Sequence, residues 1–357
     1  MSSVPYLLGI EIGETTVAAA LCRRSSPSRG RAPHASAEAA WGPAEAVALG
    51  SSAPVIPCSV VLSPSGELVA GERAARSADQ ASGFLHRVGD GVGIRLAGRM
   101  LRPEAVLAGL VGWVAGRLWQ LEGGAPDRIA VAHPTGWGPY RLRLLRSALD
   151  EGGLGEPALV PRAGAVVTGF QAAGRLPAGA ATLMVFRLDD AGLEVSLMVP
   201  HAMGQWELIT SAWCADLGGS ELDAAGAAGQ RSILRAGVDL ATRTVAACGL
   251  SPAELSAVLL AGSATGHSAL TDLLAQAFRV PVVRLGDPGL TVACGAALSV
   301  RPRARSDRPG PAPLVPESPT AEAPMVTPME PLPPGPIGAL PPPRPPVRVT
   351  EAPVGRR

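Results

Sequence analysis

The fold is first indicated by the segment Leu7-Leu8-Gly9-Ile10-Glu11-Ile12-Gly13-Glu14-Thr15-Thr16-Val17 and the apolar run that continues it to Leu21. An apolar stretch stops at Gly13, two threonines follow, and apolar residues resume, which predicts a strand, a tight turn and a second strand. Glycine in such a turn lets a ligand approach the backbone, and threonine hydroxyls with free N–H groups can hold a phosphate. Glu11 and Glu14 bring negative charge to the same turn.

Composition limits the classes of function. The chain has 357 residues, 47% of them hydrophobic, which predicts about two domains or one large bilobal unit. A net charge of +1 argues against a general nucleic-acid or membrane-surface binder. All 31 residues counted as Lys+Arg are arginine, and the chain contains no lysine and no asparagine. Chemistry that needs a lysine ammonium or an asparagine amide is therefore excluded.

Cysteine spacing and apolar runs bear on the compartment. The five cysteines are scattered without CxxC spacing, which predicts reduced thiols in a cytoplasmic protein rather than a disulfide framework or a zinc site. The N-terminus lacks the basic region of a signal peptide. The apolar run 105–116 is too short to span a bilayer, so we expect no membrane insertion.

The chain divides by composition into a folded part, up to about residue 300, and a Pro-rich tail, 301–357. The tail holds 18 of the 36 prolines. This composition predicts a disordered segment that samples polyproline II. Two roles stay open: a passive solubilising tail, or a ligand for an SH3- or WW-like domain of an unknown protein partner.

Patterns typical of strands and helices alternate along the folded part, which predicts an α/β fold. The tryptophans, including Trp137, Trp206 and Trp213, are interpreted as packing residues. Residues 24–50 are interpreted as a long surface loop. The expected strands are 55–62, 128–133, 183–188, 193–199, 258–261 and 280–285, and the expected helices are 103–121, 139–150, 268–278 and one capped by Asp287.

Six segments, in order, resemble the nucleotide-binding domain of the Hsp70 chaperones, a divergent actinobacterial type within the actin/sugar kinase/Hsp70 superfamily. The resemblance implies an α/β, bilobal actin/Hsp70 ATPase-like (ribonuclease H-like) fold. It places lobe I at 1–180 and a reduced lobe II at 181–300, with the last helix, 287–300, returning toward lobe I. The segments are 9–17, 128–153, 185–197, 217–223, 259–263 and 287–297.

The resemblance also implies a site for ATP or ADP with Mg²⁺. Family members grip the phosphates with two hairpins, organise Mg²⁺ with acidic residues and use a lysine at the transferred phosphate. The corresponding binding positions are Gly13, Glu14, Thr15 and Thr16 on the first hairpin, Arg187 and Gly192 on the second, Gly218 and Gly219 in the LGG element, Gly262 and Ser263 at the adenosine turn, and Glu11 for the metal.

The charged positions of this site depart from the family pattern. The first threonine of hairpin one is Glu14, the leading aspartate of hairpin two is Arg187, and the glycine-rich turn is Asp-Asp-Ala-Gly at 189–192. A carboxylate about 4 Å from a phosphate oxygen costs roughly 4 kcal/mol at an effective dielectric of 20. The glutamate before the lobe crossing is Arg162, and the lysine position falls at 85–87, where no lysine exists.

These departures leave three functions open. The first is a degenerate Hsp70-like binding, scaffold or chaperone-related module with weak or no ATPase activity. The alternatives are an active ATP-dependent chaperone ATPase, with Glu11 and Glu14 as Mg²⁺ ligands, and a sugar kinase of the same superfamily. The stretch 223–258 is shorter than the family's, so the subdomain over the adenine is expected to be largely absent. No catalytic residue is assigned.

Overall fold

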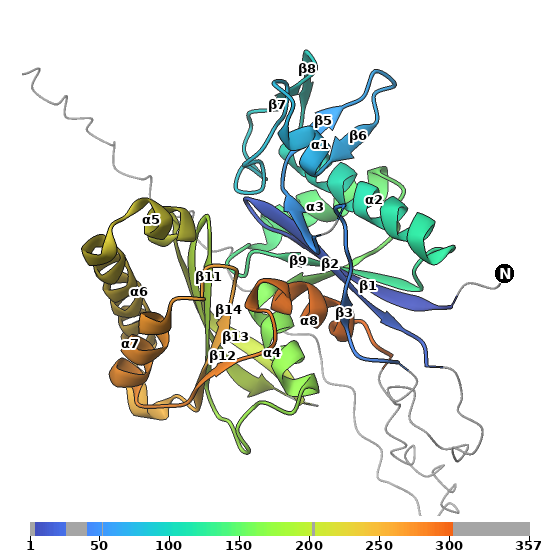
Figure 1. The fold of residues 1–357 in the computed structure, drawn as a ribbon. Coiled ribbons are helices and arrows are strands. Elements are labelled where there is room, and N and C mark those ends of the chain that lie inside the picture. Colours follow the sequence, from blue (N-terminus) through green and yellow to red (C-terminus); the bar gives the residue numbers. More distant parts are fainter. Residues whose placement is uncertain (1–3, 26–40, 52, 202–203, 303–357) are drawn as a thin grey trace, which may run out of the picture. The chain divides into compact units, whose positions relative to one another are not determined.

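The computed structural model describes residues 4–25, 41–51, 53–201 and 204–302. Most of the loop expected at 24–50 and nearly all of the tail at 301–357 lie outside these residues. The ordered elements contain two large sheets, which belong to one unit within residues 1–305 (Figure 1).

The first sheet has the strand order β10-β9-β1-β2-β3, and β4 also pairs with β2. The central strand β1 runs antiparallel to β2 and parallel to β9, and β9 runs parallel to β10. β3 and β4 both run antiparallel to β2. The strands are β1 (Tyr6–Ile12), β2 (Thr16–Arg23), β3 (Glu45–Ala46), β4 (Val55–Pro57), β9 (Arg128–His133) and β10 (Ala158–Pro161).

The second sheet repeats this arrangement with the order β13-β12-β11-β14-β15. Its central strand β11 runs antiparallel to β12 and parallel to β14, β12 runs antiparallel to β13, and β14 runs parallel to β15. The two halves therefore share strand order and strand direction. The strands are β11 (Leu183–Asp189), β12 (Gly192–His201), β13 (Gln205–Cys214), β14 (Ala257–Ala261) and β15 (Val282–Arg284).

Two helices, α4 (Arg162–Ala172) and α8 (Thr291–Ser299), lie between the sheets and pack against each other (Figure 1). Their contact requires glycine, because a Cβ on Gly295 would overlap the carbonyl of Ala165. The outer faces of the sheets carry the remaining long helices. α2 (Pro103–Glu122) and α3 (Pro139–Glu151) belong to the core of the first sheet, and α6 (Ala227–Ala247) and α7 (Ser268–Phe278) belong to that of the second.

Strand alternation decides which side chains face the α4–α8 layer. In β1, Leu7 belongs to this middle core, whereas the even-numbered residues pack toward α2. In β11, Leu183 and Val185 belong to the middle core. Continuing each alternation places Glu11 and Arg187 on the inner faces, near the carboxyl ends of the two central strands. The two residues thus hold equivalent positions in the two sheets.

A smaller group of elements follows β4 and lies above the first sheet in Figure 1. It contains two short antiparallel pairs. Its members are β5 (Val60–Leu62), β6 (Leu68–Ala70), α1 (Glu72–Ala75), β7 (Ile94–Leu96) and β8 (Arg99–Leu101). The other short elements are α5 (Gly219–Ala224) and the 3₁₀ turns η3 (Ala215–Leu217), η4 (Pro252–Glu254) and η5 (Pro288–Leu290).

The α/β class is confirmed, as are the hairpin at 183–199 and the helix at 268–278. The single strand expected at 55–62 is wrong. The Cys58 N–H donates to the Thr15 carbonyl at 2.7 Å, and the chain then leaves the first sheet to pair β5 with β6. Asp287 caps the η5 turn rather than the last helix. Among the described residues, no helix combines the length and the apolar character needed to cross a bilayer.

Candidate functional site

The first four predicted binding residues, 13–16, lie at the β1–β2 turn. Some backbone polar groups of this turn already form hydrogen bonds within the protein. The Gly13 N–H donates to the Thr16 carbonyl at 2.7 Å, and the Thr15 carbonyl accepts the Cys58 N–H. The Glu14 carboxylate lies 3.3 Å from Nδ1 of His86, a residue of the segment aligned with the family's lysine. Glu14 therefore pairs with a neighbouring loop of the same half of the chain.

The β11–β12 turn carries two carboxylates that accept hydrogen bonds from the turn after β14. Oδ1 of Asp189 accepts the Ser263 N–H at 3.1 Å, and Oδ1 of Asp190 accepts the Ser263 hydroxyl at 3.3 Å. The Asp190 carbonyl also accepts the Ser220 N–H from the start of α5 at 3.1 Å. At this turn, carboxylate oxygens of the protein accept the hydrogen bonds that phosphate oxygens of a nucleotide could otherwise accept.

The predicted glycines meet at the same turn and allow backbone segments to close around it. A Cβ on Gly218 would overlap the Asp190 carbonyl, and a Cβ on Gly219 would lie 3.0 Å from Asp190 Oδ1. Gly262 has φ +97°, and a Cβ there would overlap the Leu188 carbonyl. The structure therefore brings Gly192, Gly218, Gly219, Gly262 and Ser263 together around this turn, and Gly192 also lies against Trp213 and Cys214 of β13.

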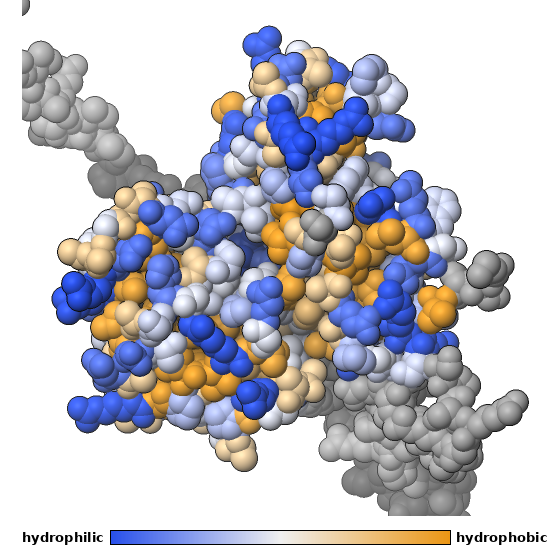
Figure 2. Space-filling view, in the orientation of Figure 1, coloured by the Kyte–Doolittle hydropathy of each residue, from blue (hydrophilic) through white to orange (hydrophobic). Residues whose placement is uncertain are grey.

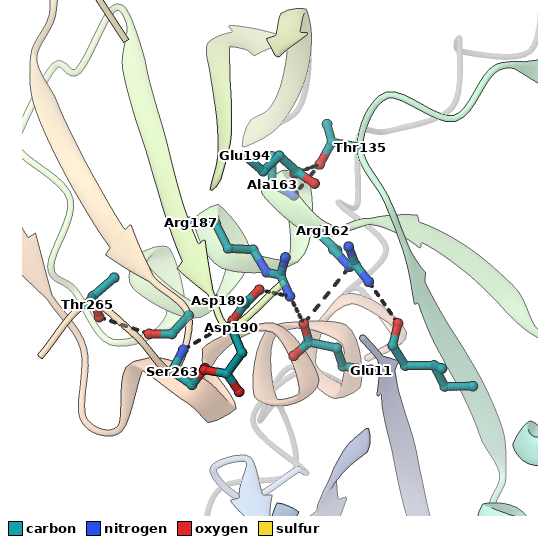
Figure 3. Close-up of polar contacts among 12 residues, drawn as sticks. Glu11, Thr135, Arg162, Ala163, Arg187, Asp189, Asp190, Glu194, Ser263 and Thr265 are labelled. Carbon is teal, nitrogen blue, oxygen red and sulfur yellow. Dashed lines mark hydrogen bonds and ion pairs between the residues drawn. The ribbon is translucent and has the colours of Figure 1, made fainter. Parts of the chain in front are cut away.

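A buried ion pair joins the two sheets (Figure 3). Nη2 of Arg187, on β11, donates to Oε1 of Glu11, on β1, at 2.7 Å. The same guanidinium contacts the Asp189 carboxylate. Arg162, at the start of α4, lies with Nε 4.0 Å from Glu11 Oε1 and donates from Nη2 to the Ile12 carbonyl at 2.8 Å. Glu11, Arg162 and Arg187 are 6%, 2% and 4% exposed, so water screens these charges little.

A further carboxylate completes this group. Glu194, on β12, lies opposite Arg187 in the hairpin register and is buried. The Thr135 hydroxyl donates to Glu194 and accepts the Ala163 N–H at 3.0 Å. Thr135 therefore ties the loop after β9 to both α4 and the second sheet.

The charged group contains three carboxylates, those of buried Glu11 and Glu194 and of half-buried Asp189, and the two buried guanidiniums of Arg162 and Arg187. Burial raises the pKa of the Glu11 carboxyl above its ordinary value, although the two arginines act against this rise. Burial lowers the pKa of Arg187, but Asp189 and Glu11 more than offset that effect and leave it raised. With every member ionised, the group carries a net negative charge.

Two guanidiniums lie beside the Glu11 carboxylate, the predicted metal ligand. Its Oε1 is 2.7 Å from Nη2 of Arg187 and 4.0 Å from Nε of Arg162, and these positive charges oppose a bound cation. Within the described parts of the chain, no three His, Cys, Asp or Glu side chains gather in an arrangement that could hold a metal ion.

Two cavities flank the pair formed by Glu14 and His86. One, of about 250 Å³, is also lined by Trp137, Arg141 and Glu194. The other, of about 680 Å³, is also lined by Thr15 and Ser59. Trp213 lines both cavities and is 46% exposed, while part of its ring packs against Gly192.

Glu194, Thr135 and His86 were absent from the predicted site. A signal for Glu194 was present, because a two-residue turn at Asp190 and Ala191 places residue 187 opposite residue 194. A carboxylate between apolar strand residues needs a partner when buried, and Arg187 is that cross-strand neighbour. No comparable signal exists for Thr135 or His86, whose partners lie far away in sequence.

No protein-family model matches the chain, and no curated protein sequence matches it. The function must therefore be inferred from the contacts described above.

Proposed function

We propose that the two sheets are the two lobes of an actin/Hsp70-like fold. Three features support this assignment: the shared strand order, the shared strand directions, and the six sequence segments that resemble the Hsp70 nucleotide-binding domain. The β1–β2 and β11–β12 turns follow the central strands of their sheets, which is where that fold would place its two phosphate hairpins.

We further propose that this module acts by binding a protein partner, as a scaffold or chaperone-related component, and does not depend on ATP hydrolysis. The observation that carries the proposal is the buried ion pair between Glu11 and Arg187. It joins the two sheets between the turns, where the resemblance would place nucleotide phosphates. A side-chain contact takes the role that a bound nucleotide would have in holding the halves together.

Charge supports the same conclusion. A triphosphate would approach a buried group with more carboxylates than guanidiniums, and the carboxylates of Glu14 and Asp190 lie on the two flanking turns. Each unit charge about 4 Å from a phosphate oxygen would cost roughly 4 kcal/mol at an effective dielectric of 20. Phosphoryl transfer depends on positioning and charge compensation, and the residues present do not fit Mg-ATP in that role.

Calorimetric titration with Mg-ATP and Mg-ADP, combined with a phosphate-release assay on the full chain, tests this function. We expect neither measurable binding at millimolar nucleotide nor turnover. The Gly13→Val variant is the control, because a side chain at this position would obstruct a phosphate at the β1–β2 turn. Turnover by the wild type that Gly13→Val abolishes would overturn the proposal and favour the active ATPase.

The partner itself is proposed to be a protein, bound through the Pro-rich segment 301–357. That segment lies outside the described residues, so the proposal rests on its sequence alone. Titration of the full chain with isolated SH3 and WW domains tests it, and failure of every domain to bind would leave the segment a passive tail.

A further inference from the structure

A cavity of about 680 Å³ opens beside the β1–β2 turn and is lined by both halves of the chain. Glu14 and Thr15 come from the turn, His86 from the loop before β7, and Ala191 and Trp213 from the second sheet. The surface is hollowed between the part that carries β7 and β8 and the part that carries α5 (Figure 2). The cavity is therefore open to a small molecule from solution.

Glu14 gives this cavity an anionic character. Of the described residues that line it, Glu14 supplies the only carboxylate, and none is an arginine although the chain has 31 basic residues. The Glu14 side chain is 17% exposed, and its partner His86 is a counter-charge only when protonated. Asp190, on the adjoining turn, adds to the negative potential because its carboxylate accepts a neutral hydroxyl and forms no ion pair with a basic side chain among the described residues.

Trp213 provides the second element of recognition. Its indole is 46% exposed and lines the cavity together with the hydroxyl groups of Thr15, Ser59 and Ser82. An exposed indole near a carboxylate attracts organic cations, because the ring quadrupole and the carboxylate act with the same sign. A neutral ligand of the same shape keeps the apolar contact with the indole but gains neither electrostatic term, and Glu14 repels an anionic ligand.

We propose that this cavity binds a small organic cation, with an alkylammonium group against Trp213 and its charge beside Glu14. The inference goes beyond the proposed function, since it assigns a small-molecule ligand to a module proposed to bind protein. It rests on that function in one respect: the cavity adjoins the two turns and is available only if nucleotide does not occupy them. The Glu14 carboxylate that attracts the cation would repel a phosphate.

The test compares choline with 3,3-dimethylbutan-1-ol, its uncharged isostere, on the full chain. Calorimetry gives the affinity, and tryptophan fluorescence reports contact with the indole. We expect choline to bind with a Kd of about 1 mM or tighter and the uncharged isostere to bind at least about tenfold more weakly, equivalent to about 1.4 kcal/mol. Equal affinities, or no choline binding up to about 10 mM, would overturn the proposal.

Two variants and two matched controls assign the site. Glu14→Gln keeps the side-chain shape and should weaken choline binding at least about tenfold, whereas Glu156→Gln, at an exposed carboxylate elsewhere, should not. Trp213→Phe should remove most of the fluorescence response, and Trp119→Phe, at another exposed indole, should preserve it. Full choline affinity in Glu14→Gln would refute the site.

The same preparation separates this proposal from the proposed function. Mg-ATP binding to the wild type would contradict the proposed function. Absent choline binding would contradict the cation site and leave the nucleotide-independent function standing.

Discussion

The ion pair between the sheets predicts an asymmetry between its two partners. Arg187→Met would leave Glu11, Asp189 and Glu194 with Arg162 as their only guanidinium. Removing one partner of a buried ion pair costs about 3–5 kcal/mol, because the remaining charge stays buried and unpaired. We therefore expect Arg187→Met to lower the free energy of unfolding by about that amount.

Glu11→Gln should behave differently, although it breaks the same ion pair. The amide oxygen can still accept the Arg187 hydrogen bond, and two carboxylates then balance the two guanidiniums. Burial already raises the pKa of Glu11, so its charge is costly to keep in this interior. The expected loss is about 1 kcal/mol or less, the net value of one ordinary hydrogen bond.

Urea unfolding of the wild type and both single variants, followed by circular dichroism, measures this difference. Arg76→Met is the matched control, because Nη2 of Arg76 lies 4.0 Å from the Glu72 carboxylate in an ion pair whose side chains are 82% and 39% exposed. Exposed pairs contribute about 0–1 kcal/mol, so the control should change little. Equal destabilisation by Glu11→Gln and Arg187→Met would refute the charge balance inferred here.

Three further predictions concern pH and glycine contacts. Because the pKa of Glu11 is raised, the folded chain binds a proton that the unfolded chain has released, and the contribution of Glu11 to stability falls as pH rises above the ordinary value of 4.5. Glu11→Gln should therefore gain in Tm relative to the wild type with rising pH, and the opposite trend would contradict this reasoning. Gly295→Ala should lower the free energy of unfolding by about 1–3 kcal/mol, because the added Cβ would overlap the Ala165 carbonyl. Gly116→Ala, in open space within α2, should raise it by about 1 kcal/mol, and urea unfolding measures both changes. Gly262→Ala should cost at least about 1–2 kcal/mol, the strain of a left-handed backbone, and an unchanged Tm would show that the turn relaxes.

Much of the fold could be predicted where apolar spacing is regular. The helix α7 was predicted with its observed bounds, because Leu270, Leu273 and Leu274 recur at helical spacing, and the structure buries Leu270 and Leu274. The strand β13 was missed, since it is an edge strand whose residues are half-exposed or exposed and show no buried apolar face. The helix α6 was also missed, although its buried residues Leu234, Val238, Ala241 and Val245 recur at helical spacing.

Individual residues of the candidate site could be predicted from the sequence, but the contacts between them could not. Motif positions at the two turns were identified, and the structure brings those of the second turn together. The partner of Glu11 could not be found from spacing, because Arg187 lies 176 residues away. Only the register of the β11–β12 hairpin, which pairs Arg187 with Glu194, offered a local signal for a buried charge pair.

Opposite charges at equivalent positions give the two sheets a direct contact. Glu11 and Arg187 are inward residues near the ends of the two central strands, and loss of either would leave the other buried without its shortest charge partner across the sheets. The resemblance implies an aspartate at both positions in a nucleotide-binding family member, and two facing carboxylates need a cation or water between them. A glutamate facing an arginine needs neither, because the two side chains neutralise each other directly. On this reasoning the arginine at residue 187, where the resemblance implies an aspartate, supplies the contact that joins the two sheets.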